Sequence, residues 1–254
     1  MPWLRMTRIS CLALLALLVG ACAAGGDVSR PIPTAYYAAP QGGQRLVVML
    51  PGRGDDLASM QRKGMAGIIQ DAWPTADVLL TGLTMPFYRQ GRATQRLQYE
   101  VIKPARQRGA SEIWIMGISL GGMGAILYDR EYPGEARGLL LLSPYLGDRA
   151  IQDEVRDAGG IVRWNPGPIR NLDAGTFQHE LWRTIRNWAD DPQRKQSVWL
   201  AYGTDEPFRK PIELMTPALV PSQVFAMPGQ HDWELWIPAA RALLKASAPA
   251  PPTR

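Results

Sequence analysis

Cysteine and histidine are scarce in this chain of 254 residues, which contains two of each. The cysteines are Cys11 and Cys22, and the histidines are His179 and His231. Four such residues are too few for a framework of several disulfides or for a zinc cluster with several Cys and His ligands. Any catalytic imidazole therefore belongs to His179 or His231.

Charged residues make up only 20% of the chain, whereas 46% of it is hydrophobic. This balance excludes a disordered chain, a collagen-like repeat and a multi-pass membrane protein, each of which needs a far more skewed composition. The length suits one domain of roughly 200 to 250 residues or two smaller ones, with a large apolar core.

The N-terminal segment has the pattern of a bacterial export signal. Arg5 and Arg8 precede an apolar run from Ile9 to Val19, which is shorter than the roughly 20 residues that a membrane span needs. The run ends in Leu18-Val19-Gly20-Ala21-Cys22, which resembles the lipobox of bacterial lipoproteins. The resemblance implies that residues 1–21 are removed and that Cys22 is lipidated and becomes the N-terminus. An ordinary signal with an incidental cysteine remains the alternative, because Ala21 also suits conventional cleavage.

The residue after the cysteine bears on localisation. In lipoproteins an Asp at this position favours the inner membrane, and here the residue is Ala23. The resemblance therefore implies a lipid anchor in the cell envelope, with the periplasmic face of the outer membrane favoured over the inner membrane.

The excess of positive charge is small once this segment is removed. Loss of residues 1–21 leaves 26 basic and 23 acidic residues, a formal charge of +3 without a polybasic run, so nucleic acid is not an expected partner. Arg89, Arg92, Arg96 and Lys103 follow one another at helical spacing. This stripe indicates a solvated helix face, or a surface that contacts anionic lipid head groups or an acidic substrate.

Composition divides the mature chain into three parts. Residues 22–40, rich in glycine and proline, are expected to be the lipidated N-terminus and a tether, and residues 246–254 a frayed tail. Between them, residues 41–245 alternate short apolar runs with longer stretches of helical pattern, which predicts an α/β domain with a mostly parallel sheet of about six or more strands flanked by helices. The predicted strands are 45–50, 77–83, 112–118, 138–142, 197–202 and 223–227, and the predicted helices are 57–72, 91–108, 121–131, 207–216 and 233–245.

The gap between the fourth and fifth predicted strands is unusually long. Residues 147–195 contain several tryptophans and a proline-rich stretch, Trp164-Asn165-Pro166-Gly167-Pro168. We expect short helices here that form a lid over one end of the sheet. A packed second layer without a role in substrate binding is the alternative.

The motif with the clearest chemical meaning is Gly117-Ile118-Ser119-Leu120-Gly121. It follows an apolar predicted strand and precedes a predicted helix, which is the context of a nucleophile elbow. The glycines avoid clashes between strand and helix, and the sharp turn presents the serine hydroxyl. Ser119 is therefore the predicted nucleophile.

A serine hydroxyl needs a general base, and an imidazole with a pKa near 6.5 suits that role. His231 lies in a loop between the last predicted strand and the last helix, whereas His179 lies within the tryptophan-rich insertion. The sequence thus favours His231 as the base. His179 is expected to be a polar surface or lid residue.

The base needs a carboxylate that orients its ring and stabilises its charged form. Asp205 follows the fifth predicted strand, and the order Ser119, Asp205, His231 is typical of this architecture. Glu206 is the rival carboxylate. Asp232 is a poor candidate because an adjacent residue rarely reaches its neighbour's ring, and a helix-capping role remains the alternative for Asp205.

Acyl transfer also requires donors for the developing oxyanion, usually two backbone amides. The residue after the nucleophile, Leu120, is expected to supply one. The loop Pro51-Gly52-Arg53-Gly54 follows the first predicted strand, and its glycines let the backbone approach a substrate. We assign the second donor to the amide of Arg53.

With these motifs in place, residues 44–245 resemble the α/β-hydrolase superfamily. The resemblance rests on Pro51-Gly52-Arg53-Gly54, Gly117-Ile118-Ser119-Leu120-Gly121-Gly122, Gly203-Thr204-Asp205 and Gly229-Gln230-His231-Asp232-Trp233, and it is nearest to the carboxylesterase, thioesterase and putative-esterase branches. Those relatives often have His-Gly where this chain has Pro51-Gly52, and no strand is evident before Gln41.

Resemblance and residue roles together predict a serine hydrolase that cleaves small-molecule or lipid-like carboxylic esters through an acyl-enzyme. Neither a metal nor an organic cofactor is required. The alternatives are a thioesterase, amidase or acyltransferase with the same catalytic residues, and a lipid-anchored binding protein that has kept the fold without turnover.

Overall fold

The structure, a computed structural model, describes residues 26–43 and 45–248. The predicted signal peptide, Cys11, Cys22 and most of the predicted tail lie outside these residues. Within the described residues, seven strands form one sheet in the order β1-β3-β2-β4-β5-β6-β7. β1 is antiparallel to β3, and all other neighbouring pairs are parallel. The strands are β1 (Thr34–Tyr37), β2 (Arg45–Leu50), β3 (Ala76–Thr81), β4 (Glu112–Ile118), β5 (Gly138–Leu142), β6 (Val198–Gly203) and β7 (Val224–Met227).

Helices occupy most of the connections between these strands. The α-helices are α2 (Leu57–Arg62), α3 (Met65–Ala72), α4 (Met85–Arg89), α5 (Ala93–Arg96), α6 (Lys103–Gln107), α7 (Leu120–Glu131), α8 (Arg149–Asp157), α9 (Phe177–Asp190), α10 (Pro192–Lys195), α11 (Arg209–Met215) and α12 (Trp233–Ala246). A π-helical segment, η1 (Leu97–Ile102), joins α5 to α6, and 3₁₀ turns η2 (Thr216–Ala218) and η3 (Pro221–Gln223) lie before β7.

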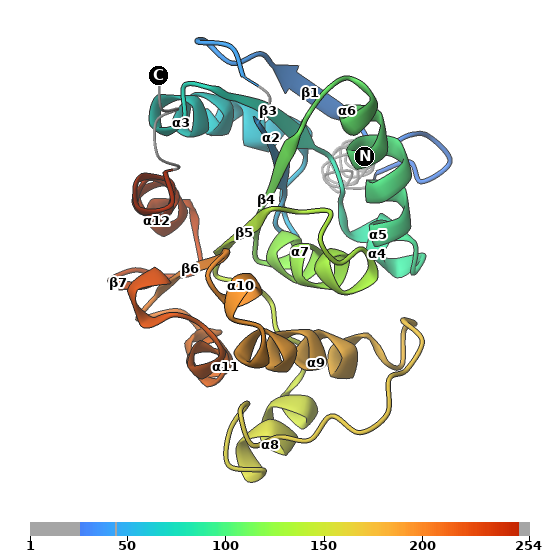
Figure 1. Cartoon of the computed structure of the whole chain (residues 1–254), viewed down its shortest axis with the longest axis vertical. Coiled ribbons are helices and arrows are strands. Elements are labelled where there is room, and N and C mark those ends of the chain that lie inside the picture. The colour runs from blue at the N-terminus through green and yellow to red at the C-terminus, as the bar shows by residue number, and fades with distance from the viewer. Residues whose placement is uncertain (1–25, 44, 249–254) are drawn as a thin grey trace, which may run out of the picture.

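The sheet is buried between two layers of helices because its strands are apolar on both faces. Along β2, Val48 and Leu50 belong to the core shared with η1, α6, α7 and α9, whereas Val47 and Met49 belong to the core shared with α2, α3 and α12. Figure 1 shows α3 and α12 on one side of the sheet and α7 on the other. The expected fold class, a mostly parallel sheet flanked by helices, is confirmed.

β1 corrects the expectation of a tether over residues 22–40. Thr34 to Tyr37 pair with residues 81 to 78 of β3, and Ile32 is buried just before the strand. The Ile32 amide also donates a hydrogen bond of 2.7 Å to Glu100 Oε2. At least residues 32–37 are therefore part of the folded domain.

Two long predicted helices are interrupted. The expected helix 57–72 divides into α2 and α3 at Gly64, which has a φ of 69°. The expected helix 91–108 consists of α5, η1 and α6, and α4 precedes it as a separate element. The basic stripe is therefore not a single helix face: Arg89 ends α4, whereas Arg96 lies in α5 and pairs with Glu100.

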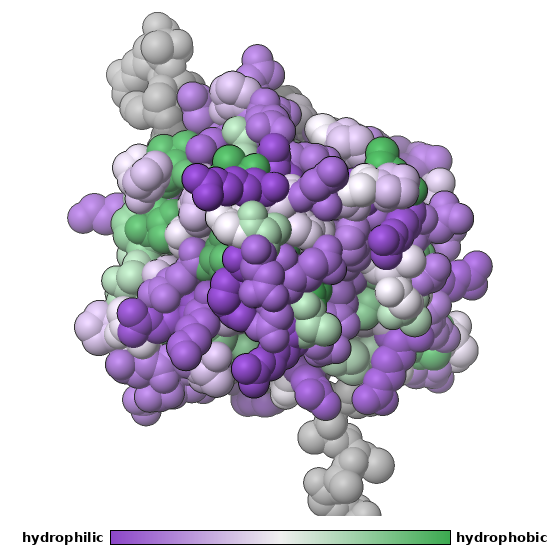
Figure 2. Space-filling view, turned by 90° about the horizontal axis from the view of Figure 1, so that it is seen from below, coloured by the Kyte–Doolittle hydropathy of each residue, from purple (hydrophilic) through white to green (hydrophobic). Residues whose placement is uncertain are grey.

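The insertion between β5 and β6 contains α8, α9 and α10, as expected of short helices. Its tryptophans Trp164, Trp182 and Trp188 are buried, and α9 packs against α7. Figure 2 looks from below in Figure 1, the side on which α8 and α9 lie, and most of that surface is hydrophilic. No helix in residues 26–43 and 45–248 is long and apolar enough to cross a membrane.

Candidate active site

The candidate site lies at the carboxyl ends of the parallel strands. Strands β2, β4, β6 and β7 of the parallel part of the sheet are followed by the segments that carry Arg53, Ser119, Glu206 and His231, respectively. In open parallel sheets, ligands bind at this edge because the loops there converge. The topology thus brings together side chains that are up to 178 positions apart in the sequence.

Ser119 occupies a strained turn between β4 and α7. Its φ of 50° and ψ of −109° are unusual for a residue with a side chain. A Cβ added at Gly117 would lie 2.3 Å from the Gly121 oxygen, and one added at Gly121 would lie 2.3 Å from the Leu50 oxygen. The predicted strand, elbow and helix are therefore present, and the close approach of their backbones requires both glycines.

Backbone hydrogen bonds hold this turn from the neighbouring strand. The Ser119 amide donates to the Leu142 oxygen over 2.9 Å, and the Tyr145 amide donates to the Ser119 oxygen over 2.9 Å. Ser143, between these two partners, also has a positive φ of 44°. The strained conformation of Ser119 is thus fixed by a second strained turn after β5.

His231 links the serine to a buried carboxylate. Its Nε2 lies 3.0 Å from Ser119 Oγ, and its Nδ1 lies 2.7 Å from Glu206 Oε2. Phe208 and Trp236 pack edge-on against the imidazole, with ring centroids 4.7 and 4.9 Å from that of His231. The ring is therefore held by hydrogen bonds at both nitrogens and by aromatic contacts.

The carboxylate that contacts His231 is Glu206, and the prediction of Asp205 is wrong. Asp205 is exposed, its amide donates to the Gly229 oxygen over 3.1 Å, and its Oδ2 accepts from the Gly229 amide over 3.2 Å. Asp205 and Glu206 lie in the turn that follows β6. Pairing with Gly229 directs Asp205 outward and Glu206 inward, where the Gly203 amide donates to Glu206 Oε1 over 3.2 Å.

The other candidates for the base and the carboxylate, His179 and Asp232, do not contact Ser119 or the His231 ring through a hydrogen bond in the described residues. His179 packs against Trp164 in the insertion, and its Nε2 lies 3.8 Å from Glu154. Burial is the main factor that lowers the pKa of His179, with nearby Arg170 next. Asp232 caps α12 by accepting hydrogen bonds from the Glu234 and Leu235 amides.

The two predicted oxyanion donors line the same cavity as Ser119. Leu120 is the first residue of α7, where backbone amides have no acceptor within the helix. Arg53 lies in the loop after β2, where the Asp55 amide donates to the Gly52 oxygen over 3.2 Å. The start of α7 and the loop after β2 thus border the same cavity as Ser119.

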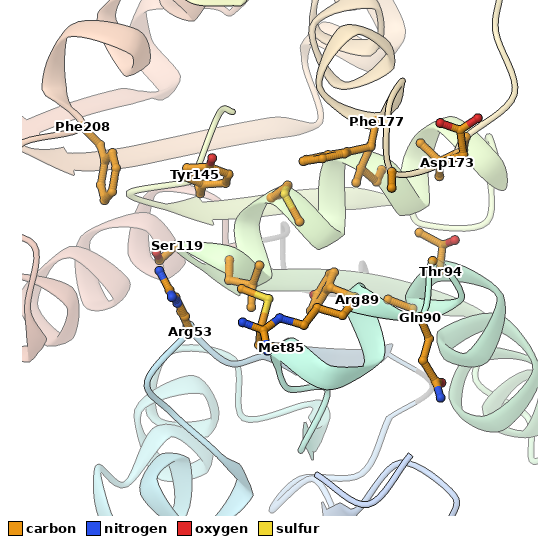
Figure 3. A pocket seen from close by; sticks show the side chains of 18 residues that line it. Arg53, Met85, Arg89, Gln90, Thr94, Ser119, Tyr145, Asp173, Phe177 and Phe208 are labelled. Atoms are coloured by element: carbon orange, nitrogen blue, oxygen red, sulfur yellow. The ribbon is translucent and has the colours of Figure 1, made fainter. Parts of the chain in front are cut away.

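The cavity beside Ser119 has a volume of about 830 Å³, at the upper end of what small-molecule sites occupy. Figure 3 shows it extending from Ser119 and Arg53 to Thr94, Gln90 and Asp173. Its apolar lining comes mainly from α4, α7 and the insertion: Met85, Tyr88, Leu120, Met123, Leu127, Leu172, Ala174 and Phe177. Burial and a hydrogen bond to Asp148 raise the pKa of Tyr145, at the Ser119 end, to about 12, so its phenol stays neutral.

Several residues of this site were not predicted from the sequence. Phe208, Trp236 and the wall residues of α4 have no distinguishing motif, since isolated aromatic and aliphatic residues are usually core. The insertion was expected over one end of the sheet, and Leu172, Ala174 and Phe177 of it do line the cavity. Among residues 26–43 and 45–248, no three His, Cys, Asp or Glu side chains are grouped so that they could hold a metal ion.

Solved structures provide the comparison that decides the fold. S-formylglutathione hydrolase FrmB from Staphylococcus aureus matches with a TM-score of 0.55 and 15% identity, over 86% of this chain and 98% of that one. A monoacylglycerol lipase from Paleococcus ferrophilus matches with a TM-score of 0.55 and 15% identity, over 86% of this chain and 100% of that one. The chain has the α/β-hydrolase fold.

A ferulic acid esterase is similar to the same degree, with a TM-score of 0.56 and 17% identity over 84% of this chain and 91% of that one. No protein-family model matches the sequence, and a search of curated proteins found no match. At these identities the α/β-hydrolase comparison concerns the fold, and the activity has to be argued from the site.

Proposed function

We propose that this α/β-hydrolase chain is a serine hydrolase that cleaves carboxylic esters through an acyl-enzyme. The observation that supports the proposal is the continuous contact from Ser119 Oγ to His231 Nε2 at 3.0 Å and from His231 Nδ1 to Glu206 Oε2 at 2.7 Å. Nucleophile, base and orienting carboxylate in this arrangement are what acyl transfer requires. The similar structures named as a lipase and an esterase agree with this chemistry.

Each residue has a defined part in the proposed reaction. Ser119 Oγ attacks the acyl carbon while His231 Nε2 takes the hydroxyl proton, and Glu206 stabilises the charged imidazole. The amides of Leu120 and Arg53 donate to the oxyanion. The carbon–oxygen bond to the alcohol then breaks as His231 returns the proton to it, and water releases the acid by the same steps.

The test combines labelling with turnover. The full chain, solubilised in a nonionic detergent, should react with a fluorophosphonate probe and hydrolyse p-nitrophenyl esters of two to sixteen carbons. Ser119→Ala should lose both properties while it unfolds at the same temperature as the wild type. A folded wild-type protein that neither reacts nor hydrolyses any ester would leave the binding-protein alternative, and transfer to added alcohols or amines would favour an acyltransferase.

We also propose export and lipidation at Cys22, on the strength of the lipobox-like sequence that ends there. Metabolic labelling with radioactive palmitate should mark the chain, and Cys22→Ala should abolish the label. Fractionation of the labelled cells should recover the protein in the outer membrane, because Ala23, and not an Asp, follows Cys22. Recovery of an unlabelled, cleaved wild-type chain would instead support an ordinary signal peptide.

A further inference from the structure

The cavity beside Ser119 combines a long apolar wall with two positive side chains. Leu120, Met123 and Leu127 lie at helical spacing on α7 and line the cavity, and Leu172 and Phe177 of the insertion line it as well. Arg53 and Arg89 line the same cavity. The cavity therefore offers both apolar surface and positive charge to a ligand.

Arg53 and Arg89 lie in the segments that follow two neighbouring strands of the sheet. β2 and β3 are parallel neighbours, Arg53 lies in the loop after β2, and Arg89 ends the helix that follows β3. In Figure 3 the side chain of Arg53 points toward Ser119, and Arg89 extends from α4 into the same space. Two guanidinium groups therefore border the nucleophile end of the cavity.

Within the described part of the chain, neither guanidinium has an ion-pair or hydrogen-bond partner, although the positive charge of Arg53 does act on the phenol of Tyr145. Arg53 and Arg89 form no ion pair or hydrogen bond with the side chains or carbonyls of residues 26–43 and 45–248. Asp148, in the segment after β5, accepts hydrogen bonds from Tyr145 and Gln178. Both arginines are exposed, so a ligand can reach them.

The acidic residue that does line the cavity lies at its other end. Asp173 accepts hydrogen bonds from the Gly175 and Thr176 amides of its own loop, and these bonds lower its pKa. In Figure 3 Asp173 lies at the same end of the cavity as Thr94, away from Arg53. Positive charge therefore predominates where the ester group would sit, and the apolar walls continue beyond it.

We infer that the substrate is an amphiphilic ester with an extended apolar acyl chain and a short alcohol that carries a phosphate or carboxylate group. The acyl chain lies along α7, and the anion of the alcohol binds Arg53 and Arg89. Guanidinium groups pair with both anions through charge-assisted hydrogen bonds. This inference rests on the proposed function, because it describes the substrate of the same serine.

The experiment compares three dodecanoyl esters with the full chain in nonionic micelles. They are 1-dodecanoylglycerol, which is neutral, 1-dodecanoylglycerol 3-phosphate, and dodecanoylglycerate, which carries a carboxylate. We expect kcat/KM for at least one anionic ester to exceed that for the neutral ester by about tenfold at low salt, and the advantage to shrink as salt is added. Comparison of kcat/KM between the two anionic esters shows whether the site prefers a phosphate or a carboxylate group.

Arg53→Gln and Arg89→Gln should each bring the ratio of anionic to neutral kcat/KM toward one. The ratio is compared within each variant, so a general loss of activity does not affect it. Arg62→Gln is the matched control, because Arg62 is also exposed and does not line the cavity. A butanoyl ester should be hydrolysed at least about a hundredfold less efficiently than its dodecanoyl counterpart, because fewer CH₂ groups are buried.

The outcomes separate this inference from the proposed function. Hydrolysis of the neutral ester with no preference for either anionic ester, or a preference that both arginine substitutions leave unchanged, overturns the inference alone. Absence of hydrolysis of all three esters in folded protein, together with absence of fluorophosphonate labelling, overturns both. Labelling without hydrolysis of any of the three also rejects the inferred substrate class.

Discussion

Glu206 lies between two groups that fix its carboxylate: its Oε2 is 2.7 Å from His231 Nδ1, and its Oε1 accepts from the Gly203 amide at 3.2 Å. Its side chain is fully buried. A carboxylate in this position would stabilise an imidazolium and fix the tautomer in which Nε2 faces the serine. Asp205, one residue earlier, is exposed and bonded to Gly229.

Substitution of these two neighbours should therefore have very different effects. Glu206→Gln should lower kcat by about 10² to 10⁴-fold, because the amide replaces the charge that supports His231. Asp205→Asn should stay within about threefold of the wild type, because the amide oxygen can still accept from Gly229. Steady-state kinetics on one p-nitrophenyl ester, with unfolding measured for both variants, checks this. A larger loss in Asp205→Asn than in Glu206→Gln would restore Asp205 as the orienting carboxylate.

A second relationship connects the loop of Arg53 with the loop of His231. The Trp233 indole nitrogen donates to Asp55 Oδ1 over 3.1 Å, and the Ser59 hydroxyl donates to the same oxygen over 3.0 Å. Trp233 also packs edge-on against Trp236, which contacts His231. The Asp55–Trp233 hydrogen bond thus ties together the two loops that would supply an oxyanion donor and the general base.

Trp233→Phe should lower kcat by about tenfold and the free energy of unfolding by about 1 to 2 kcal/mol, because the largely buried Asp55 carboxylate loses one of its two donors and the two loops are no longer tied together. KM should change little.

A double-mutant cycle with Asp55→Ala should give a coupling of about 1 kcal/mol in both measurements. Trp199→Phe is the control, because Trp199 stacks on Phe225 near the amino end of β6. This substitution should lower the free energy of unfolding and leave kcat unchanged. Additive effects of Trp233→Phe and Asp55→Ala would contradict the link.

The sheet was predictable because its strands are short, continuous apolar runs buried on both faces. The predicted bounds of β2, β4 and β5 agree with the structure, and those of β3, β6 and β7 differ by one or two residues. β1 was missed since it is a short edge strand with alternating partial exposure, and Tyr36 is 57% exposed. Edge strands bury too little apolar surface to stand out in a sequence.

Local patterns identified part of the site and tertiary contacts decided the rest. Ser119 was predictable because the elbow requires glycines at fixed spacing, and His231 because few histidines exist. The choice between Asp205 and Glu206 depended on backbone pairing with Gly229, which is 24 positions away from Asp205. The position of Arg89 in the lining of the cavity could not be predicted either, since a helical stripe does not reveal where one helix ends and another begins.

Glu180 anchors the insertion to the rest of the domain. Its fully buried carboxylate pairs with Arg130 of α7 at 3.0 Å and with Arg183 at 3.0 Å, and it accepts from the Arg170 amide at 3.1 Å. Burial opposes the charged form, but the hydrogen bonds from Arg183, Arg130 and the Arg170 amide outweigh it and hold the pKa of Glu180 below its ordinary value. The Arg183 guanidinium in turn donates to carbonyls of the proline-rich stretch before α9.

A carboxyl group whose pKa is lowered by folding stabilises the fold above its unfolded pKa, and this contribution disappears as the pH falls through the folded pKa. Glu180→Gln should therefore reduce the free energy of unfolding by about 3 kcal/mol at neutral pH, since two arginines lose their shared carboxylate. The difference from wild type should begin to narrow as the pH falls below the pKa of an unfolded glutamate, about 4.3, and should continue to shrink as the pH falls through the lower pKa of Glu180 in the folded protein. Urea denaturation from pH 7 to pH 3.5 measures this, with Glu213→Gln as the control, because the exposed Glu213–Arg209 pair should contribute less than about 1 kcal/mol. A loss in Glu180→Gln that stays constant over this range would show that the carboxylate charge is not what holds the insertion.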